Sequence, residues 1–381
     1  MRKKLCGLIL AFLLVFQALP VYGAVNAMNA SGFPNLPLSV DPTGRMEGFS
    51  AILYNNPNGL PTSEANAIAE TGEGFIWLGS YAGLIRYDGN TFERFDSTTG
   101  IANVRCLFVD EKDRMWIGTN DSGLFLMEKG KLRRWDKAEG MKSSSIRSVA
   151  EGEDGIVYVG STVGIALFDS ELNFTILEDE RIAAQTIREM RRGNGGLVYG
   201  LTSAGDLFTL KGGKVESFLS QDENPVKGVV SILPDPEHPG FLYLGTDVSQ
   251  IAYGVMEDGF ASVKIKEIAP LSDAESMEYI DGQIWICAGD GIGNLDAAGG
   301  FHLLENVPMN NSLGHVMTDY EGNLWFTSTR QGVMDAFMRL VAKGEFRAPD
   351  DDGSGTEENI DNIHKAQKES AGSADGRKGE G

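Results

Sequence analysis

A short apolar phrase recurs seven times along this chain of 381 residues. In each copy an aromatic residue with apolar neighbours is followed within two positions by a small residue, as in Ile76-Trp77-Leu78-Gly79. The aromatic positions are 39 to 44 residues apart: Trp77, Trp116, Tyr158, Tyr199, Tyr243, Trp285 and Trp325. That period is typical of one four-stranded propeller blade. The pattern predicts seven blades, with each aromatic residue on the second strand and buried in the core.

The segments between these aromatic residues fit the remaining strands of a blade. A turn rich in glycine and acidic residues precedes the aromatic strand, as at residues 153–155. A third strand opens on glycine, as at residues 83–87, and a fourth alternates apolar and polar positions, as at residues 131–135. After the first 27 residues, no stretch has the pattern of a long amphipathic helix.

The two ends of the repeated region predict how the ring closes. Residues 49–54 resemble a fourth strand with no blade before it, whereas the last unit, from Gly314, supplies only three strands. The N-terminal strand is therefore expected to complete the last blade and to remove an exposed sheet edge. The predicted fold is all-β: a seven-bladed β-propeller of four-stranded antiparallel blades over residues 48–340.

The segments outside the propeller have different compositions. Residues 1–27 combine a basic start, an apolar run over residues 5–18 and small residues near Ala24, which predicts a signal peptide. Export to the extracellular or periplasmic side of the cytoplasmic membrane follows from that prediction. Residues 341–381 lack aromatic residues other than Phe346 and are rich in acidic and small polar residues, so we expect a disordered tail.

Charge and cysteine content exclude several classes of function. A formal net charge of -21 argues against binding nucleic acid through the overall field, although it permits a local basic pocket. Cys106 and Cys287 lie on blades that are not neighbours, and neither has a cysteine or histidine at metal-ligand spacing. Aspartates beside turn glycines are ordinary turn chemistry rather than a calcium loop. We therefore expect no metal and no cofactor.

The first repeat resembles a known family. It reads Gly59-Leu60-Pro61, then Asn66, then residues 74–80 (Gly-Phe-Ile-Trp-Leu-Gly-Ser), then residues 83–89 (Gly-Leu-Ile-Arg-Tyr-Asp-Gly). This is similar to the two-component regulator propeller repeat of the extracytoplasmic sensor regions of hybrid histidine kinases and membrane-bound diguanylate cyclases. The resemblance implies a noncatalytic ligand sensor that signals through such a kinase or cyclase, with a small molecule, a saccharide or a peptide as the ligand. Relatives continue into more blades, a transmembrane helix and an output domain, whereas here the pattern stops after Met334. Our hypothesis is a sensor module that lacks this downstream half.

A ligand site is predicted at the end of the channel where the first strands begin. Eleven positions before the aromatic residue, the first four repeats carry Asn66, Arg105, Arg147 and Arg188. Three arginines at equivalent places could bind a carboxylate or phosphate in a fork geometry. Loops after the aromatic strand would add Tyr81, Asn120, Asp121, Thr162, Asp247 and Arg330. The alternative interpretation is that the arginines pair with acids in adjacent loops and hold the blades together.

Catalysis has less support from the sequence. The chain has four histidines, of which only His315 is placed where it could face the channel, and no nucleophile motif accompanies it. Two other functions stay open. One is a propeller lyase resembling streptogramin lyase, which would need a metal and a catalytic histidine. The other is a protein-interaction scaffold with no small ligand.

Overall fold

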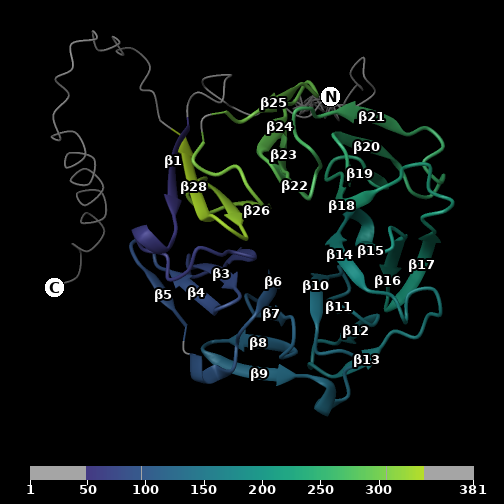
Figure 1. Ribbon diagram of the computed structural model, residues 1–381. Coiled ribbons are helices and arrows are strands. Elements are labelled where there is room, and N and C mark those ends of the chain that lie inside the picture. Colours follow the sequence, from purple (N-terminus) through teal and green to yellow (C-terminus); the bar gives the residue numbers. More distant parts are fainter. Residues whose placement is uncertain (1–48, 96, 306, 339–381) are drawn as a thin grey trace, which may run out of the picture. The chain divides into compact units, whose positions relative to one another are not determined.

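The structure is a computed structural model that describes residues 49–338 apart from 96 and 306. The predicted signal peptide and tail lie outside the described residues. The described chain forms seven four-stranded antiparallel sheets, and Figure 1 shows them arranged around a central axis. Helices among the described residues are short 3-10 turns at Asn56–Asn58, Ser97–Thr99, Lys137–Glu139 and Asn194–Gly196. The predicted all-β propeller of seven blades is confirmed.

Each blade contributes one strand at each distance from the axis. The inner strands are β2 (Ala67–Glu70), β6 (Val104–Val109), β10 (Ile146–Glu151), β14 (Ile187–Arg192), β18 (Val229–Pro234), β22 (Ser276–Ile280) and β26 (Leu313–Thr318). The second strands, which carry the aromatic residues, are β3 (Ile76–Ser80), β7 (Met115–Thr119), β11 (Val157–Ser161), β15 (Val198–Thr202), β19 (Phe241–Thr246), β23 (Gln283–Cys287) and β27 (Leu324–Ser328). The third strands are β4 (Gly83–Tyr87), β8 (Leu124–Glu128), β12 (Ile165–Phe168), β16 (Leu207–Lys211), β20 (Gln250–Val255), β24 (Ile292–Leu295) and β28 (Gly332–Met338). The outer strands are β5 (Phe92–Arg94), β9 (Lys131–Trp135), β13 (Phe174–Ile176), β17 (Lys214–Leu219), β21 (Lys264–Glu267), β25 (Phe301–Leu303) and β1 (Phe49–Tyr54).

The ring closes through the first and last described strands. Strand β1 pairs antiparallel with β28, from Phe49 opposite Met338 to Tyr54 opposite Val333. The last blade therefore has the order β1-β28-β27-β26, and the predicted closure by the N-terminal strand is confirmed. Inner strands of successive blades contact one another all the way round, and β26 of the last blade contacts β2 of the first.

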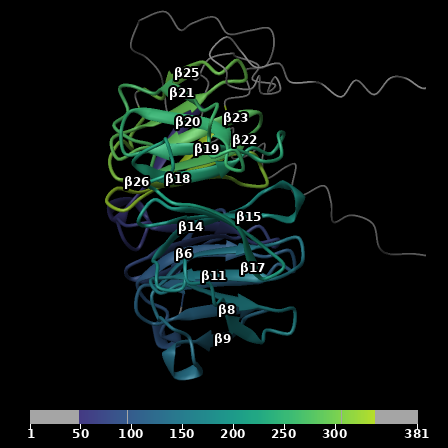
Figure 2. The ribbon, with the colours of Figure 1, turned by 90° about the vertical axis from the view of Figure 1, so that its right-hand side faces the viewer.

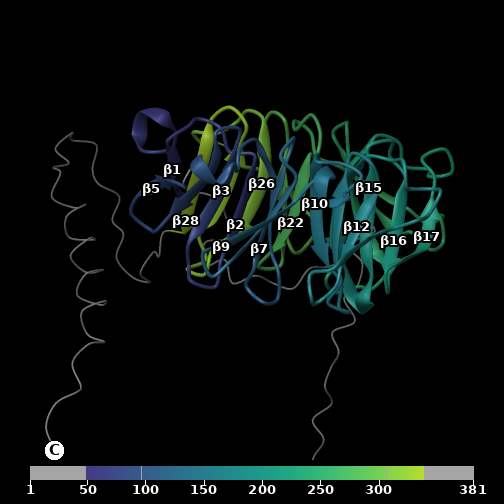
Figure 3. The same cartoon turned by 90° about the horizontal axis from the view of Figure 1, so that it is seen from below.

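The strands run between two faces of the ring, as the side views in Figures 2 and 3 show. We call the face at which the inner strands begin the mouth face, and the other the opposite face. Because neighbouring strands are antiparallel, β28 ends and β1 begins at the opposite face. The described chain thus enters and leaves the ring at one corner, on the side away from the mouth.

The recurring aromatic residues form the core between blades, as predicted. All seven are at least 95% buried, and Trp116 is completely so. The small residue that follows them has a steric reason. A Cβ added to Gly118 would lie 2.8 Å from Ile146 Cγ2, and one added to Gly160 would lie 2.7 Å from Ile187 Cγ2. The branched first residue of the next inner strand fills that space. The small residue and the branched residue of the repeat therefore pack against each other between neighbouring blades.

Acidic residues in the turns before the aromatic strands act as predicted for turn chemistry. Asp110 accepts hydrogen bonds from the Arg114 side chain at 2.6 Å and from the Trp116 indole at 2.8 Å. Asp319 accepts from the Trp325 indole at 2.8 Å in the last blade. These carboxylates close the turn and satisfy the buried indole N–H, which would otherwise be left without a partner. Cys106 and Cys287 are free thiols.

Candidate functional site

Several inner strands begin with a β-bulge at the mouth face. The pairing register shifts between Val104 and Cys106 in β6, and the same shift occurs at the equivalent places in β10, β14 and β18. The extra residues at these four bulges are Arg105, Arg147, Arg188 and Val230. A bulged residue leaves the ladder and its side chain is re-aimed, a device that is common beside functional sites. The three predicted arginines therefore occupy one structural position in three consecutive blades.

Arg188 is anchored across a neighbouring blade. Its Nε donates to the Val230 carbonyl oxygen in blade five at 2.6 Å, and its guanidinium donates to Glu275 in blade six at 2.7 Å. Both side chains of this ion pair are partly exposed, 35% for Arg188 and 42% for Glu275. The interpretation that the arginines pair with acids thus applies to Arg188, although the acid lies two blades away and not in an adjacent loop.

Arg191, three residues further along β14 than Arg188, makes a second connection between blades four and six. Its guanidinium contacts Glu189 at 2.8 Å and Glu278 at 2.6 Å, and also donates to the Met277 carbonyl oxygen at 3.3 Å. Burial alone would lower the pKa of Arg191, but the carboxylates of Glu278 and Glu189 outweigh burial and raise it. Arg191 therefore keeps its positive charge and links blade four directly to blade six.

A third ion pair crosses in the other direction. Arg192, the last residue of β14, donates to the Glu111 carboxylate, which follows β6 in blade two. Glu111 in turn donates its backbone N–H to Glu151 of blade three at 2.9 Å. Blade four is thus joined by ion pairs to blade six, through Arg188 and Arg191, and to blade two, through Arg192.

Arg105 and Arg147 differ from these arginines because no carboxylate lies within ion-pair distance of either among the described residues. The Arg147 guanidinium donates to the Asn120 side-chain oxygen. Burial, with a further contribution from Arg105, lowers the pKa of Arg147, which places the two guanidinium groups in each other's field. In a chain with a net charge of -21, two neighbouring cations without acidic partners give this side of the mouth a local excess of positive charge.

His315 joins the same group of charges from blade seven. Burial, followed by the positive charges of Arg105 and Arg191, lowers its pKa to about 3. The imidazole is therefore neutral at physiological pH and adds polarity without a third positive charge. Its contact with the Asn66 backbone acts in the other direction, since it favours the protonated ring.

The other predicted site residues have different roles. Asn66 is 3% exposed, and its amide donates to the Val104 carbonyl oxygen of the next blade at 3.0 Å, so it links blades one and two. Asn120 contacts both Arg147 and Asn103, and belongs to the arginine group. Tyr81 is 52% exposed in the loop between β3 and β4. Arg330 is exposed in the corresponding loop of blade seven.

The remaining loop residues serve local structure. The Thr162 hydroxyl lies 2.7 Å from the Ser143 hydroxyl, and Asp121 accepts a hydrogen bond from the Asn103 amide at 3.1 Å. Asp247 belongs to a pocket at the rim of blade five, outside the arginine group. The structure therefore brings together Arg105, Arg147, Asn120 and His315, and leaves Tyr81, Asp247 and Arg330 around them as separate loop positions.

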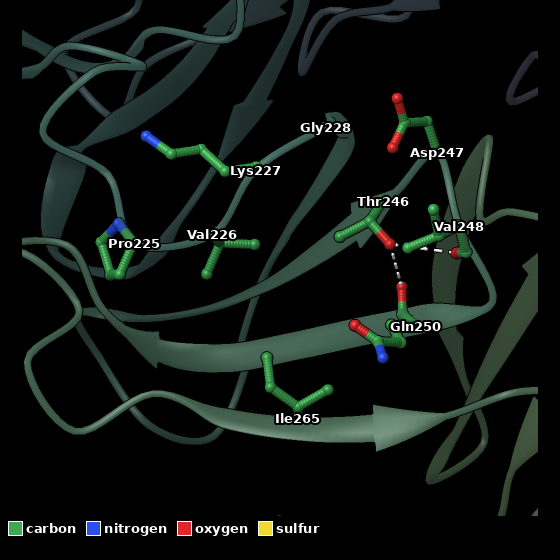
Figure 4. Close-up of a pocket in the computed structure, with 9 residues that line it drawn as sticks. All are labelled: Pro225, Val226, Lys227, Gly228, Thr246, Asp247, Val248, Gln250 and Ile265. Atoms are coloured by element: carbon green, nitrogen blue, oxygen red, sulfur yellow. Dashed lines mark hydrogen bonds between the residues drawn. The ribbon is translucent and has the colours of Figure 1, made fainter.

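The pocket in blade five has a volume of about 420 Å³ and is shown in Figure 4. Val248 and Ile265, which line it, are 50% and 46% exposed. The Lys227 side chain points away from Asp247 in Figure 4, because its ammonium group donates to the backbone oxygens of Gln221 and Asp222. The pocket thus offers apolar surface beside the mouth and no cation directed into it.

The sequence did not predict the ion pairs between blades. They join Arg188 to Glu275, Arg191 to Glu278 and Arg192 to Glu111. One signal was present: residues 189–192 read Glu-Met-Arg-Arg, an unusually charged end for an inner strand. The acidic partners on other blades could not be recognised because they are 81 to 87 residues away in the chain.

The described residues contain neither a cluster of metal ligands nor a candidate membrane span. Between residues 49 and 338, no three histidine, cysteine, aspartate or glutamate side chains are grouped so that they could hold a metal ion. In the same range, no helix has the length and apolar character of a membrane span.

The fold and the bulged arginines define a class: a seven-bladed β-propeller that presents guanidinium groups at one end of its channel. The family model for the two component regulator propeller matches residues 100–121, which include Arg105 and the strands β6 and β7. The match confirms that the chain carries the two-component regulator propeller repeat that the sequence indicated. A comparison with curated proteins gave no match.

Solved structures with the same fold include a lyase, an extracellular domain of a putative two component system and a protein bound to a peptide. A streptogramin B lyase aligns with a TM-score of 0.63 and 15% identity, over 76% of this chain and 98% of the lyase. The extracellular domain of a putative hybrid two component system from B. thetaiotaomicron aligns with a TM-score of 0.63 and 15% identity, over 75% of this chain and 40% of that chain. YCF48 bound to D1 peptide aligns with a TM-score of 0.59 and 16% identity, over 76% of this chain and 96% of that chain. At these identities the likeness shows the fold alone.

Proposed function

We propose that this chain is a noncatalytic, exported sensor module of a bacterial signal-transduction system, and that it recognises an anionic small molecule at the mouth face. A membrane histidine kinase or diguanylate cyclase would be its signalling partner. The repeat family and the fold of two-component sensor domains support the class of protein. The predicted leader at residues 1–27 supports export.

We infer the class of ligand from two arginines at the bulges, Arg105 and Arg147, whose charges have no acidic partner among the described residues. Arg105 and Arg147 are placed by the backbone at equivalent positions, they repel each other, and no described carboxylate neutralises them. Holding like charges together is unfavourable unless an anion compensates them. Binding of a carboxylate or phosphate between them would relieve this repulsion and would supply charge-assisted hydrogen bonds.

The test is ligand-induced thermal stabilisation with a panel of defined anions: acetate, dicarboxylates from succinate to adipate, and inorganic phosphate. A bound ligand stabilises the folded state in proportion to the logarithm of its concentration over Kd. We expect at least one anion to raise Tm, and we expect the shift to vanish in an Arg105→Gln, Arg147→Gln double variant. Higher salt should weaken the effect.

The matched control is Lys131→Gln with Lys214→Gln, which removes the same charge from the first positions of two outer strands. This variant should keep the anion-induced shift. A shift that survives in the arginine variant, or that falls equally in the lysine variant, would show that overall charge and not the mouth binds the anion. If no anion in the panel raises Tm, anion recognition is wrong.

The position of His315 supports a second candidate, a propeller lyase, because this histidine lies near the channel arginines. The lyase would need a metal-dependent turnover that is lost in His315→Ala. For a sensor, neither the parent protein nor His315→Ala should show turnover. The adjoining coding sequence should then contain a kinase or cyclase output domain.

A further inference from the structure

Arg188 differs from the other two bulge arginines because a carboxylate of the chain itself already occupies it. Glu275 accepts from Arg188 at 2.7 Å, whereas Arg105 and Arg147 have no such partner among the described residues. The three arginines occupy the same bulge position in consecutive blades. The Arg188 pair therefore shows, inside this molecule, how a bulge arginine holds a carboxylate.

The backbone around the pair fixes the arginine and leaves the acid free to move. The Arg188 Nε is tied to the Val230 carbonyl oxygen at 2.6 Å, which holds the guanidinium in front of blade five. Glu275 stands just before β22, where its neighbour Ala274 makes the ordered contacts: its N–H donates to Thr246 and its oxygen accepts from Ser231. The Glu275 side chain is 42% exposed, so it can turn into solvent without breaking a strand pair.

We propose that Glu275 is an internal competitor for the ligand, and that the ligand is a dicarboxylate whose second carboxylate displaces Glu275 from Arg188. This inference rests on the proposed anion site at Arg105 and Arg147. A partly exposed ion pair contributes little stability, so the displacement has a small cost. Arg147 and Arg188 stand on inner strands that contact each other, β10 and β14. A dicarboxylate held at Arg105 and Arg147 would present its other end to Arg188 at a high effective concentration when its length matches the span between them. Glu275 thus sets both the affinity and the preference for two carboxylates over one.

The experiment measures the affinity of acetate and of the series from succinate to adipate by calorimetry, at low salt, for the parent protein and for Glu275→Gln. We expect the substitution to tighten binding of the best dicarboxylate by about fivefold, the factor that corresponds to an exposed ion pair. Acetate, which needs only Arg105 and Arg147, should bind equally well to both proteins. Equal tightening of acetate and dicarboxylate, or no tightening, would overturn the inference.

Two controls separate local competition from overall charge. Glu178→Gln removes an exposed carboxylate beyond the outer strand of blade three and should leave every affinity unchanged. In an Arg188→Gln background, Glu275→Gln should have no further effect, because the competed group is gone. An undiminished effect in that background would overturn the proposal. If Arg105→Gln, Arg147→Gln abolishes anion binding but Glu275→Gln does not change the affinity for dicarboxylates, the proposed function stands and only the role of Glu275 is rejected. If the parent protein binds no anion, both proposals are rejected.

Discussion

The ion pairs of Arg191 should contribute measurably to the stability of the ring. Replacing Arg191 by Met keeps much of the apolar stem and removes the guanidinium, which leaves Glu189 and Glu278 without their cation. Removing one partner of a fully buried pair costs about 3–5 kcal/mol. The side chains here are 24%, 18% and 34% exposed for Arg191, Glu189 and Glu278, so water compensates part of the loss. We expect Arg191→Met to lower the free energy of unfolding by about 2 kcal/mol.

Urea denaturation followed by tryptophan fluorescence measures this loss. Arg181→Met is the matched control, because Arg181 pairs with Asp179 at the rim with 45% of its side chain exposed. That exposed pair should contribute less than about 1 kcal/mol. The double variant Arg191→Met, Glu278→Gln should be more stable than the sum of the single changes predicts, since the second change removes an unpaired charge. If Arg191→Met costs no more than Arg181→Met, the connection between blades four and six does not stabilise the ring.

Three further changes test the packing and the buried charges. Gly118→Ala should cost about 1–3 kcal/mol in urea denaturation, because its Cβ would lie 2.8 Å from Ile146 Cγ2 and still closer to Cys106 Sγ. If it costs nothing, the steric account of the small residue is wrong. Burial raises the pKa of Asp335 to about 7, so the folded state favours the neutral acid and loses stability as pH rises from about 4 to about 7. The free energy of unfolding of Asp335→Asn should match that of the parent near pH 4 and exceed it by about 1–2 kcal/mol at pH 8, since the carboxyl is only partly buried. If the two free energies depend on pH in the same way, this account of Asp335 is wrong. Asp110→Ala should destabilise by about 3 kcal/mol, because Arg114 is left as a buried cation, and an unchanged urea midpoint would show that this carboxylate is dispensable.

The sequence predicted the elements that repeat. The aromatic period located all seven blades, and the unpaired strand at residues 49–54 located the closure, because each depends on a local pattern that recurs at a known distance. The arginine positions were also visible, since a bulge in equivalent strands keeps equivalent residues in register.

The partners of these arginines could not be predicted from the same pattern. Arg188 contacts the Val230 backbone in blade five and Glu275 in blade six, and the bulge position of blade five carries no arginine. Whether a side chain crosses a channel depends on the size of the residue in between and on the diameter of the ring, neither of which a period encodes. For the same reason Asn66, which shares the alignment with the arginines, is turned to the Val104 carbonyl oxygen of the neighbouring blade.

The single seam of the ring has a mechanical consequence. Phe49 and Met338 form the last pair of the β1–β28 ladder, so the two chain segments that join the ring there pull on the same end of that ladder. Tension between them would load the hydrogen bonds of the ladder one pair after another, in an unzipping geometry, and not all together as in a shear geometry. The β1–β28 ladder would therefore separate at lower force than a ladder loaded along its length. Separation would begin at the opposite face, which lies farthest from the arginines.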